Sequence, residues 1–455
     1  MGFIDRQNRY IAAYISIFLA NKIKIGDEHN KLLAQIKKDL DDISINILHK
    51  LKMQHKVIDG YYIKSPISEL VNCIINYAYT MQASDIHLEP QEKYLQIRFR
   101  VDGKMILIYQ LDNKISNYLV SYLKLIANLD IAEKRIPQDG KINFSSKDVT
   151  NLDIRISTIP IIFGEKIVLR LLGNIQTLLS LDNMEFSYTN LNNFKEMIHL
   201  SSGLIVITGP VNSGKSTLLY AILNYLNHTD MNIVTIEDPI ELDIQGINQM
   251  QVNFKAGLDW SLALKAILRQ DPDIVMIGEI RDDIVAKQAI TTALTGHLVL
   301  TTLHTTNALG VPARLIDMGV SPMMLSIALT GMTAQRLVRK ICPYCKVKYK
   351  PQMNSLESLF LGKDFYVGMD LYKGSGCEKC NYTGFKGQVA IQEVFQVTDK
   401  IRHLISKSDV DLNLKRMAQM EGFKNLLDDG KSKVLQGITT VQEVWQVING
   451  VYKLG

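Results

Sequence analysis

The sequence predicts an α/β protein whose larger part is built on a parallel β-sheet. Short runs of consecutive apolar residues recur in the middle part of the chain, at 204–207, 233–236, 274–277 and 298–300. Continuous runs of this kind are typical of parallel strands that are buried on both faces. Helical patterns separate the runs, as crossover helices do, and this favours a parallel sheet with helices packed on its faces.

The composition is that of an ordinary globular protein. Of the 455 residues, 47% are hydrophobic and 21% are charged, which excludes a disordered, collagen-like or fibrous chain. The formal charge of +5 is small for this size, so the charge balance gives no argument for nucleic-acid binding. Five cysteines do not suggest a disulfide scaffold, and the length corresponds to about three domains.

Residues 1–60 are expected to form a short helical N-terminal region. Apolar residues between 32 and 51 recur at spacings of three and four. The apolar segment 10–20 is too short for a membrane span, which takes about 20 residues, and it lacks a good signal-peptide cleavage site. We interpret it as a helix that packs against protein or a membrane surface. We therefore expect a cytoplasmic chain that is at most peripheral to a membrane.

An α+β domain is expected at 61–172. The segment 94–101 alternates apolar and polar residues, as a half-buried strand does, and Asp102-Gly103 then marks a turn into a return strand. The other strands expected in this domain are 106–109, 153–159 and 166–172.

A polar stretch at 173–193 is expected to be a linker. It precedes the α/β domain, which we place at 194–455. The last part of that domain, 396–455, has mostly helical patterns.

The segment GPVNSGKST matches the phosphate-loop pattern G-x-x-x-x-G-K-[ST]. It follows the apolar run 204–207 and precedes an apolar helical run, which is the context that this motif requires. Its glycines let backbone N–H groups turn inward around phosphates, and the helix N-terminus adds positive potential. Lys215 is expected to neutralise the β- and γ-phosphates of ATP, and the Ser216 hydroxyl to ligate Mg²⁺. The nucleotide-binding residues expected are Gly209, Pro210, Val211, Asn212, Ser213, Gly214, Lys215, Ser216 and Thr217.

Two carboxylates follow strands of the predicted sheet, Glu237 after 233–236 and Glu279 after 274–277. The carboxyl ends of parallel strands meet at one edge of a sheet, so both are expected near the phosphate loop. Hydrolysis needs one carboxylate for Mg²⁺ and another to orient or deprotonate the attacking water. We favour Glu237 for the water and Glu279 for the metal. The roles could be exchanged, and either residue could be a solvated strand end.

Two histidines flank the apolar run 298–300. His304 lies at its carboxyl end and is a candidate sensor of the γ-phosphate, with a structural histidine as the alternative. His297 lies at the opposite end, so we expect it to make no direct contact with nucleotide.

Four cysteines occur as two C-x-x-C pairs, Cys342 with Cys345 and Cys377 with Cys380. Four thiolates suit a structural Zn²⁺, because they leave no open coordination position. We place this zinc module at 340–386 and expect residues 350–372 to protrude as a loop. A redox pair and ordinary buried cysteines are the alternatives, and Cys73 is expected to be an ordinary core residue.

Taken together, these motifs resemble the ATPase family of type II secretion and type IV pilus assembly, the GspE-like or PilB-like motors, over about residues 65–450. The segments that carry the resemblance are 83–90 (ASDIHLEP), 97–103 (IRFRVDG), 153–158, 164–170 (GEKIVLR), 235–241 (TIEDPIE), 295–304, 334–339 (AQRLVR) with the four cysteines, and 429–444. Retraction motors of the same superfamily lack the cysteine module, so its presence argues for assembly or secretion.

The resemblance implies a PAS-like domain followed by a RecA-like P-loop NTPase domain, with six chains in a ring and ATP between the two domains. It implies that Arg155 and Arg170 reach the γ-phosphate, where a guanidinium can stabilise transition-state charge. Solvated strand arginines are the alternative. The implied partners are further copies of the chain, an inner-membrane platform protein and a recruiter at the inner membrane, with no direct nucleic acid.

The sequence departs from the family pattern at two places. Val211 and Asn212 stand where the family usually has Thr-Gly, and Asn tolerates the left-handed backbone that Gly allows. Met184-Glu185 replaces Leu-Gly in the linker, which could alter hinge flexibility. The short N-terminal region leaves the recruiter open. The alternative functions are a DNA-uptake or conjugation motor and a nucleotide-binding ring scaffold with weak hydrolysis.

Overall fold

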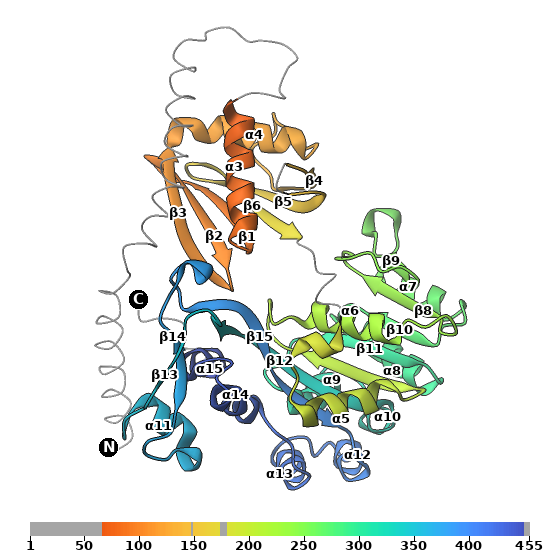
Figure 1. The fold of residues 1–455 in the computed structure, drawn as a ribbon. Helices are drawn as coiled ribbons and strands as arrows, with labels where there is room; N and C mark the ends of the chain where they lie inside the picture. Colours follow the sequence, from red (N-terminus) through yellow and green to blue (C-terminus); the bar gives the residue numbers. More distant parts are fainter. Residues whose placement is uncertain (1–65, 147–148, 173–179, 450–455) are drawn as a thin grey trace. The chain divides into compact units, whose positions relative to one another are not determined.

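The computed structural model describes residues 66–146, 149–172 and 180–449 (Figure 1). The expected helical region 1–60 lies outside the described residues. The chain divides into two compact units. One comprises Met1–Asn174 and Gly376–Gly384, and the other comprises Ile175–Ser375 and Phe385–Gly455.

The first unit contains a six-stranded antiparallel sheet with the strand order β3-β2-β1-β6-β5-β4 (Figure 1). The strands are β1 (Ala83–Pro90), β2 (Tyr94–Val101), β3 (Lys104–Asp112), β4 (Gln138–Phe144), β5 (Leu152–Ile161) and β6 (Gly164–Leu172). The helices α3 (Pro66–Thr80) and α4 (Ser116–Ile126) share a core with one face of this sheet. Alternate strand residues such as Ile86, Leu88 and Phe99 enter that core, so the residues between them, Asp85 and Glu89 among them, lie on the opposite face.

The second unit contains a seven-stranded sheet with the order β15-β12-β7-β11-β10-β8-β9. Its strands are β7 (Gly203–Thr208), β8 (Ile233–Glu237), β9 (Asn248–Gln251), β10 (Ile274–Ile277), β11 (Leu298–Leu303), β12 (Leu329–Ile341) and β15 (Phe385–Gln396). All neighbouring pairs are parallel except β15, which is antiparallel to β12 at the edge. The predicted α/β class with a parallel sheet is confirmed.

Helices cover both faces of this sheet. The central strands carry apolar side chains on both faces, and these side chains are buried against the helices. In β7, Leu204 and Val206 join one core cluster, while Ile205 and Ile207 join the other. The helices of this unit are α5 (Tyr188–Ile198), α6 (Lys215–Leu226), α7 (Trp260–Ile267), α8 (Asp283–Leu294), α9 (Val311–Asp317), α10 (Pro322–Ala328), α11 (Leu356–Leu361), α12 (Asp399–Ser406), α13 (Leu412–Met420), α14 (Leu426–Leu435) and α15 (Val441–Asn449). None of the described helices is long and apolar enough to cross a membrane.

The expected linker 173–193 is partly helical, which corrects the prediction for its second half. Helix α5 begins at Tyr188, and Ser187 caps it by accepting a hydrogen bond from the backbone of Asn190. The part of α5 inside the expected linker is mostly polar, and the buried apolar residues Phe194, Met197 and Ile198 come after it, which is why composition alone suggested a loop. Glu185 has the left-handed φ of 51° that a glycine would take there, and its carboxylate pairs with Lys340.

The spacer between the cysteine pairs is also more ordered than expected, and the prediction of a protruding loop at 350–372 is wrong. It contains α11 and ends in β14 (Leu371–Gly374), which pairs with β13 (Lys346–Tyr349). Phe360 and Leu361 of α11 are buried in one cluster with Val441 and Val444 of α15. The spacer is therefore held by an apolar core that it shares with the C-terminal helices.

Candidate functional site

The phosphate loop connects β7 to α6 in the second unit, as the sequence predicts. Asn212 has a φ of 62°, so this asparagine does take the left-handed conformation expected of it. Gly214 has a φ of 82° and is the residue before the first turn of α6, which begins at Lys215. The loop therefore ends at a helix N-terminus, where the backbone N–H groups favour an anion.

Lys215 folds back over its own loop. Its Nζ donates to the carbonyl oxygens of Gly209 and Pro210, at 2.8 and 3.0 Å. Burial lowers the pKa of Lys215 to about 8, and the charge of Arg336 adds to this, while the charge of Glu279 opposes it. Glu279 and Arg336 are thus electrostatic neighbours of the phosphate-loop lysine.

Glu237 is buried at the carboxyl end of β8 with 4% of its surface exposed. Its Oε2 accepts a hydrogen bond from the Tyr220 hydroxyl at 2.5 Å, and its Oε1 accepts from Thr235 at 2.6 Å and from Gln249 at 3.0 Å. Burial, reinforced by this carboxylate, raises the pKa of Tyr220, which keeps the tyrosine a donor. Oε1 thus accepts two hydrogen bonds and Oε2 accepts one, and a carboxylate oxygen can accept two, so Oε2 keeps acceptor capacity for a water.

Glu279 follows β10 and is more accessible than Glu237. Its side chain is 25% exposed and forms an ion pair with Arg281, which also contacts Asp238 at 3.2 Å. His304 follows β11 directly, and its Nε2 lies 3.6 Å from Glu279 Oε2. Glu279 and His304, which were predicted separately, are therefore brought together at the carboxyl edge of the sheet.

The two arginines named from the resemblance lie on the polar face of the sheet in the first unit. Arg155 on β5 is directly opposite Arg170 on β6, and Arg170 is opposite Asp85 on β1. Asp85 Oδ1 lies 3.1 Å from Arg170 Nε, and its Oδ2 lies 3.5 Å from Arg100 Nε. This row carries more positive than negative charge, so it suits an anion.

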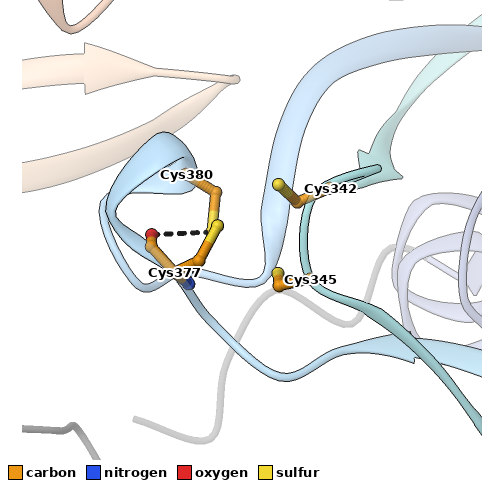
Figure 2. A group of neighbouring side chains, drawn as sticks. All are labelled: Cys342, Cys345, Cys377 and Cys380. Atoms are coloured by element: carbon orange, nitrogen blue, oxygen red, sulfur yellow. Dashed lines mark hydrogen bonds between the residues drawn. The ribbon is translucent and has the colours of Figure 1, made fainter.

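The four cysteines predicted to bind metal form a cluster. Their Sγ atoms all lie within 4.8 Å of one another, and Figure 2 shows the two pairs facing each other. None of them is in a disulfide. In a tetrahedral site with bonds of ~2.3 Å the sulfurs are about 3.8 Å apart, and Cys377 and Cys380 already have this separation, 3.8 Å. The arrangement fits a four-thiolate metal site that needs little rearrangement.

Sequence reasoning did not identify three residues that contact the predicted site. Tyr220 contacts Glu237, Arg281 contacts Glu279, and Gln335 contacts the phosphate loop. Arg281 is only two residues after Glu279, and Gln335 lies in the segment 334–339 that carries part of the family resemblance, but neither had an assigned role. No local pattern indicated a role for Tyr220, because it is one of many apolar or aromatic residues in the sequence of α6. His297 hydrogen-bonds Thr292 at the opposite end of β11 from the phosphate loop, as expected.

Comparison with known proteins identifies clear relatives. A family profile described as "Type II/IV secretion system protein" matches residues 63–446. The chain is 45% identical over 381 residues to the type IV pilus assembly ATPase PilB of Thermus thermophilus, which covers 84% of this chain and 43% of that protein. It is 42% identical over 424 residues to the type II secretion system protein E of Dickeya dadantii, which covers 93% of this chain and 83% of that protein. The chain thus spans less than half the length of the first relative.

Two solved structures share the fold. The ATPase DotB of Legionella pneumophila aligns with a TM-score of 0.62 at 20% identity, over 86% of this chain and 98% of that chain. The pilus retraction motor PilT, solved with bound ADP, aligns with a TM-score of 0.56 at 24% identity, over 82% of this chain and 95% of that chain. At these identities the likeness establishes the fold alone.

Proposed function

The chain belongs to the type II/IV secretion system protein family, and on this premise we propose that it is a Mg²⁺-dependent motor ATPase. Its work is to power assembly of a type IV pilus or of a type II secretion pseudopilus. The observation that carries the proposal is that the phosphate loop with Lys215 follows β7 and Glu279 follows β10, so both lie at the carboxyl edge of one parallel sheet, where the charge of Glu279 acts on Lys215. A phosphate-binding cation beside a metal-binding carboxylate is what hydrolysis of a nucleoside triphosphate requires.

Each site residue has a proposed role. Lys215 and the backbone of the phosphate loop bind the β- and γ-phosphates, and the exposed Ser216 hydroxyl and Glu279 hold Mg²⁺, which neutralises phosphate charge when bound. Glu237 orients the attacking water through Oε2, which accepts from Tyr220, and His304 senses the γ-phosphate beside Glu279. Arg155 and Arg170 add positive charge for the γ-phosphate, a role that rests on the family resemblance.

The metal of the cysteine cluster is proposed to be Zn²⁺, held by Cys342, Cys345, Cys377 and Cys380. Four thiolates leave no position for substrate, so the ion is structural. The proposed partners are further copies of the chain in a homo-hexamer, an inner-membrane platform protein and a membrane recruiter. The proposed location is the bacterial cytoplasm, peripheral to the inner membrane. A DNA-uptake motor and a ring scaffold with weak hydrolysis are the competing proposals.

The test of the motor proposal is steady-state phosphate release by the purified chain. Release is expected from ATP with Mg²⁺ and not when EDTA removes the metal. Lys215→Ala is expected to abolish it, because the phosphates lose their direct cation. Lys287→Ala is the matched control, since Lys287 lies on the exposed part of α8 in an ion pair with Asp283. Equally slow release from all three proteins would favour the scaffold.

The lowered pKa of Lys215 predicts a pH dependence of nucleotide affinity. Below about pH 8 the lysine is charged before and after binding, so affinity does not change through this group. Above about pH 8 the free lysine loses its proton, and bound phosphate must restore it. Affinity for ADP is therefore expected to fall by up to about tenfold per pH unit over that range. Calorimetric titration between about pH 7 and 9.5 measures this fall.

Lys215→Arg is the control for this pH effect, because arginine keeps its charge throughout the range. Its affinity for ADP is expected to stay level where that of the unchanged chain falls. Parallel curves for the two proteins would contradict the assignment of the titration to Lys215.

A further inference from the structure

A buried pair of glutamines supports the outer side of the phosphate loop. Gln335 lies on β12 and Gln392 directly opposite on β15, with 1% and 0% of their surfaces exposed. Gln335 Nε2 donates to the carbonyl oxygen of Ser213, at 2.8 Å, and Gln392 Nε2 donates to Gln335 Oε1, at 3.0 Å. The two amides and the loop carbonyl therefore form one chain of hydrogen bonds.

The loop needs such a donor for a geometric reason. When its N–H groups turn inward toward phosphate, carbonyl groups turn outward, and a buried carbonyl without a donor costs about 1–3 kcal/mol. Strand β12 is the parallel neighbour of β7, and Ala334 pairs with Thr208, the last residue before the loop. The next residue, Gln335, is therefore level with the loop and can supply the donor.

The direction of the hydrogen bonds follows from the Ser213 carbonyl. A carbonyl only accepts, so the amide nitrogen of Gln335 must face it and the amide oxygen must face Gln392. Gln392 is anchored in turn, because its backbone N–H donates to Asp429 Oδ2 at 2.9 Å. The same carboxylate oxygen accepts from Lys433 at 2.9 Å, and both of these residues lie on α14.

The glycines of the phosphate loop leave room for Gln335. A Cβ atom at Gly214 would lie 2.7 Å from Gln335 Nε2, and one at Gly209 would lie 2.6 Å from the Gln335 carbonyl oxygen. Both distances are shorter than van der Waals contact. Gln335 therefore packs directly against the two motif glycines, and a side chain at either glycine position would collide with it.

We infer that Gln335 is a positioning residue for phosphate binding, which acts through the Ser213 carbonyl and is held in orientation by Gln392. It makes no contact with nucleotide in this role. The inference rests on the proposed nucleotide-binding function, since it assigns the residue that keeps the phosphate loop in its binding conformation.

The test uses the full chain with Gln335→Glu and Gln335→Leu, and measures ADP affinity by calorimetry from about pH 6 to 9. The leucine variant removes the donor and is expected to bind about tenfold to a hundredfold more weakly at every pH. The glutamate variant keeps the shape. When protonated it can donate to Ser213, and when ionised it repels the carbonyl, while burial raises its pKa. Its affinity relative to the unchanged chain is expected to recover at low pH.

Thr333→Val is the matched control, because Thr333 is a buried residue of β12 whose hydroxyl makes no hydrogen bond among the described residues. It is expected to bind ADP as the unchanged chain does. A second readout needs no nucleotide: hydrogen exchange at residues 209–214 is expected to rise in Gln335→Leu and, by less, in Gln392→Leu. Unchanged exchange together with unchanged affinity in the Gln335 variants would overturn the inference. Failure of the unchanged chain to bind ADP would instead refute the proposed function, while the exchange readout would still show whether Gln335 holds the conformation of the loop.

Discussion

Changing Glu237 to glutamine is expected to lower the rate of ATP hydrolysis by about 10²–10⁴-fold while ATP still binds. The amide has nearly the shape of the carboxylate, but it cannot take a proton from water. Tyr220, Thr235 and Gln249 donate to the two oxygens of Glu237, and the amide keeps only one of these acceptors. Single-turnover phosphate release and ADP affinity, measured on the same preparation, separate the chemical step from binding.

Glu279→Gln is the variant that distinguishes the two carboxylates. The variant is expected to need a higher Mg²⁺ concentration for half-maximal rate. Glu279 is the more accessible of the two carboxylates, and its charge acts on the phosphate-loop Lys215. Glu196→Gln, an exposed change on α5, is the control and is expected to have no effect. If Glu237→Gln shifts only the Mg²⁺ requirement and Glu279→Gln abolishes hydrolysis at saturating Mg²⁺, the two roles are exchanged.

Removal of zinc is expected to unfold the zinc module, residues 340–386, which contains the four clustered cysteines. Structural zinc contributes about 10–16 kcal/mol in small zinc-binding peptides, so its loss exceeds what the local core can offset. The cluster closes the spacer whose helix α11 shares a core with α15, and this core includes Phe360 and Val444. Elemental analysis is expected to give about one zinc per chain, and Cys342→Ser combined with Cys377→Ser is expected to lose the ion and to lower the unfolding temperature.

Cys73→Ser is the matched control for the cysteine variants. Cys73 packs against the core of the first unit and is not one of the clustered cysteines, so its replacement is expected to leave the zinc content unchanged. A metal-free preparation that unfolds at the same temperature as the zinc-loaded one would contradict the structural role. It would favour the redox or ordinary buried interpretation of the cysteines.

Much of the fold could be predicted from the sequence because its signals are local. The apolar runs at 204–207 and 274–277 coincide with β7 and β10, and the alternating segment 94–101 is β2. The phosphate loop is contiguous, so a single stretch of residues specifies both its backbone and its lysine. Each cysteine pair is also a local pattern, and the prediction that the four cysteines meet is confirmed as a cluster.

The spacer and the linker show where local signals fail. Leu361 of α11 is buried in a core that includes Val441 of α15. A short apolar stretch within a polar segment does not reveal which distant residues complete such a core. Helix α5 contains about as many polar as apolar residues, so its sequence alone resembles a loop. In both cases packing against distant residues overrides local propensity.

The chain by itself determined the α/β class, the phosphate loop, the carboxylates that end two strands, and the paired cysteines. Only the tertiary structure decided which groups hold these residues in place. Gln335 and Ser213 are 122 positions apart in the sequence, yet they share a buried hydrogen bond, and Tyr220 reaches Glu237 from a different element. The physical reason is that a buried carbonyl or carboxylate must find donors wherever the fold supplies them, and no local pattern specifies a donor that comes from a neighbouring strand or helix.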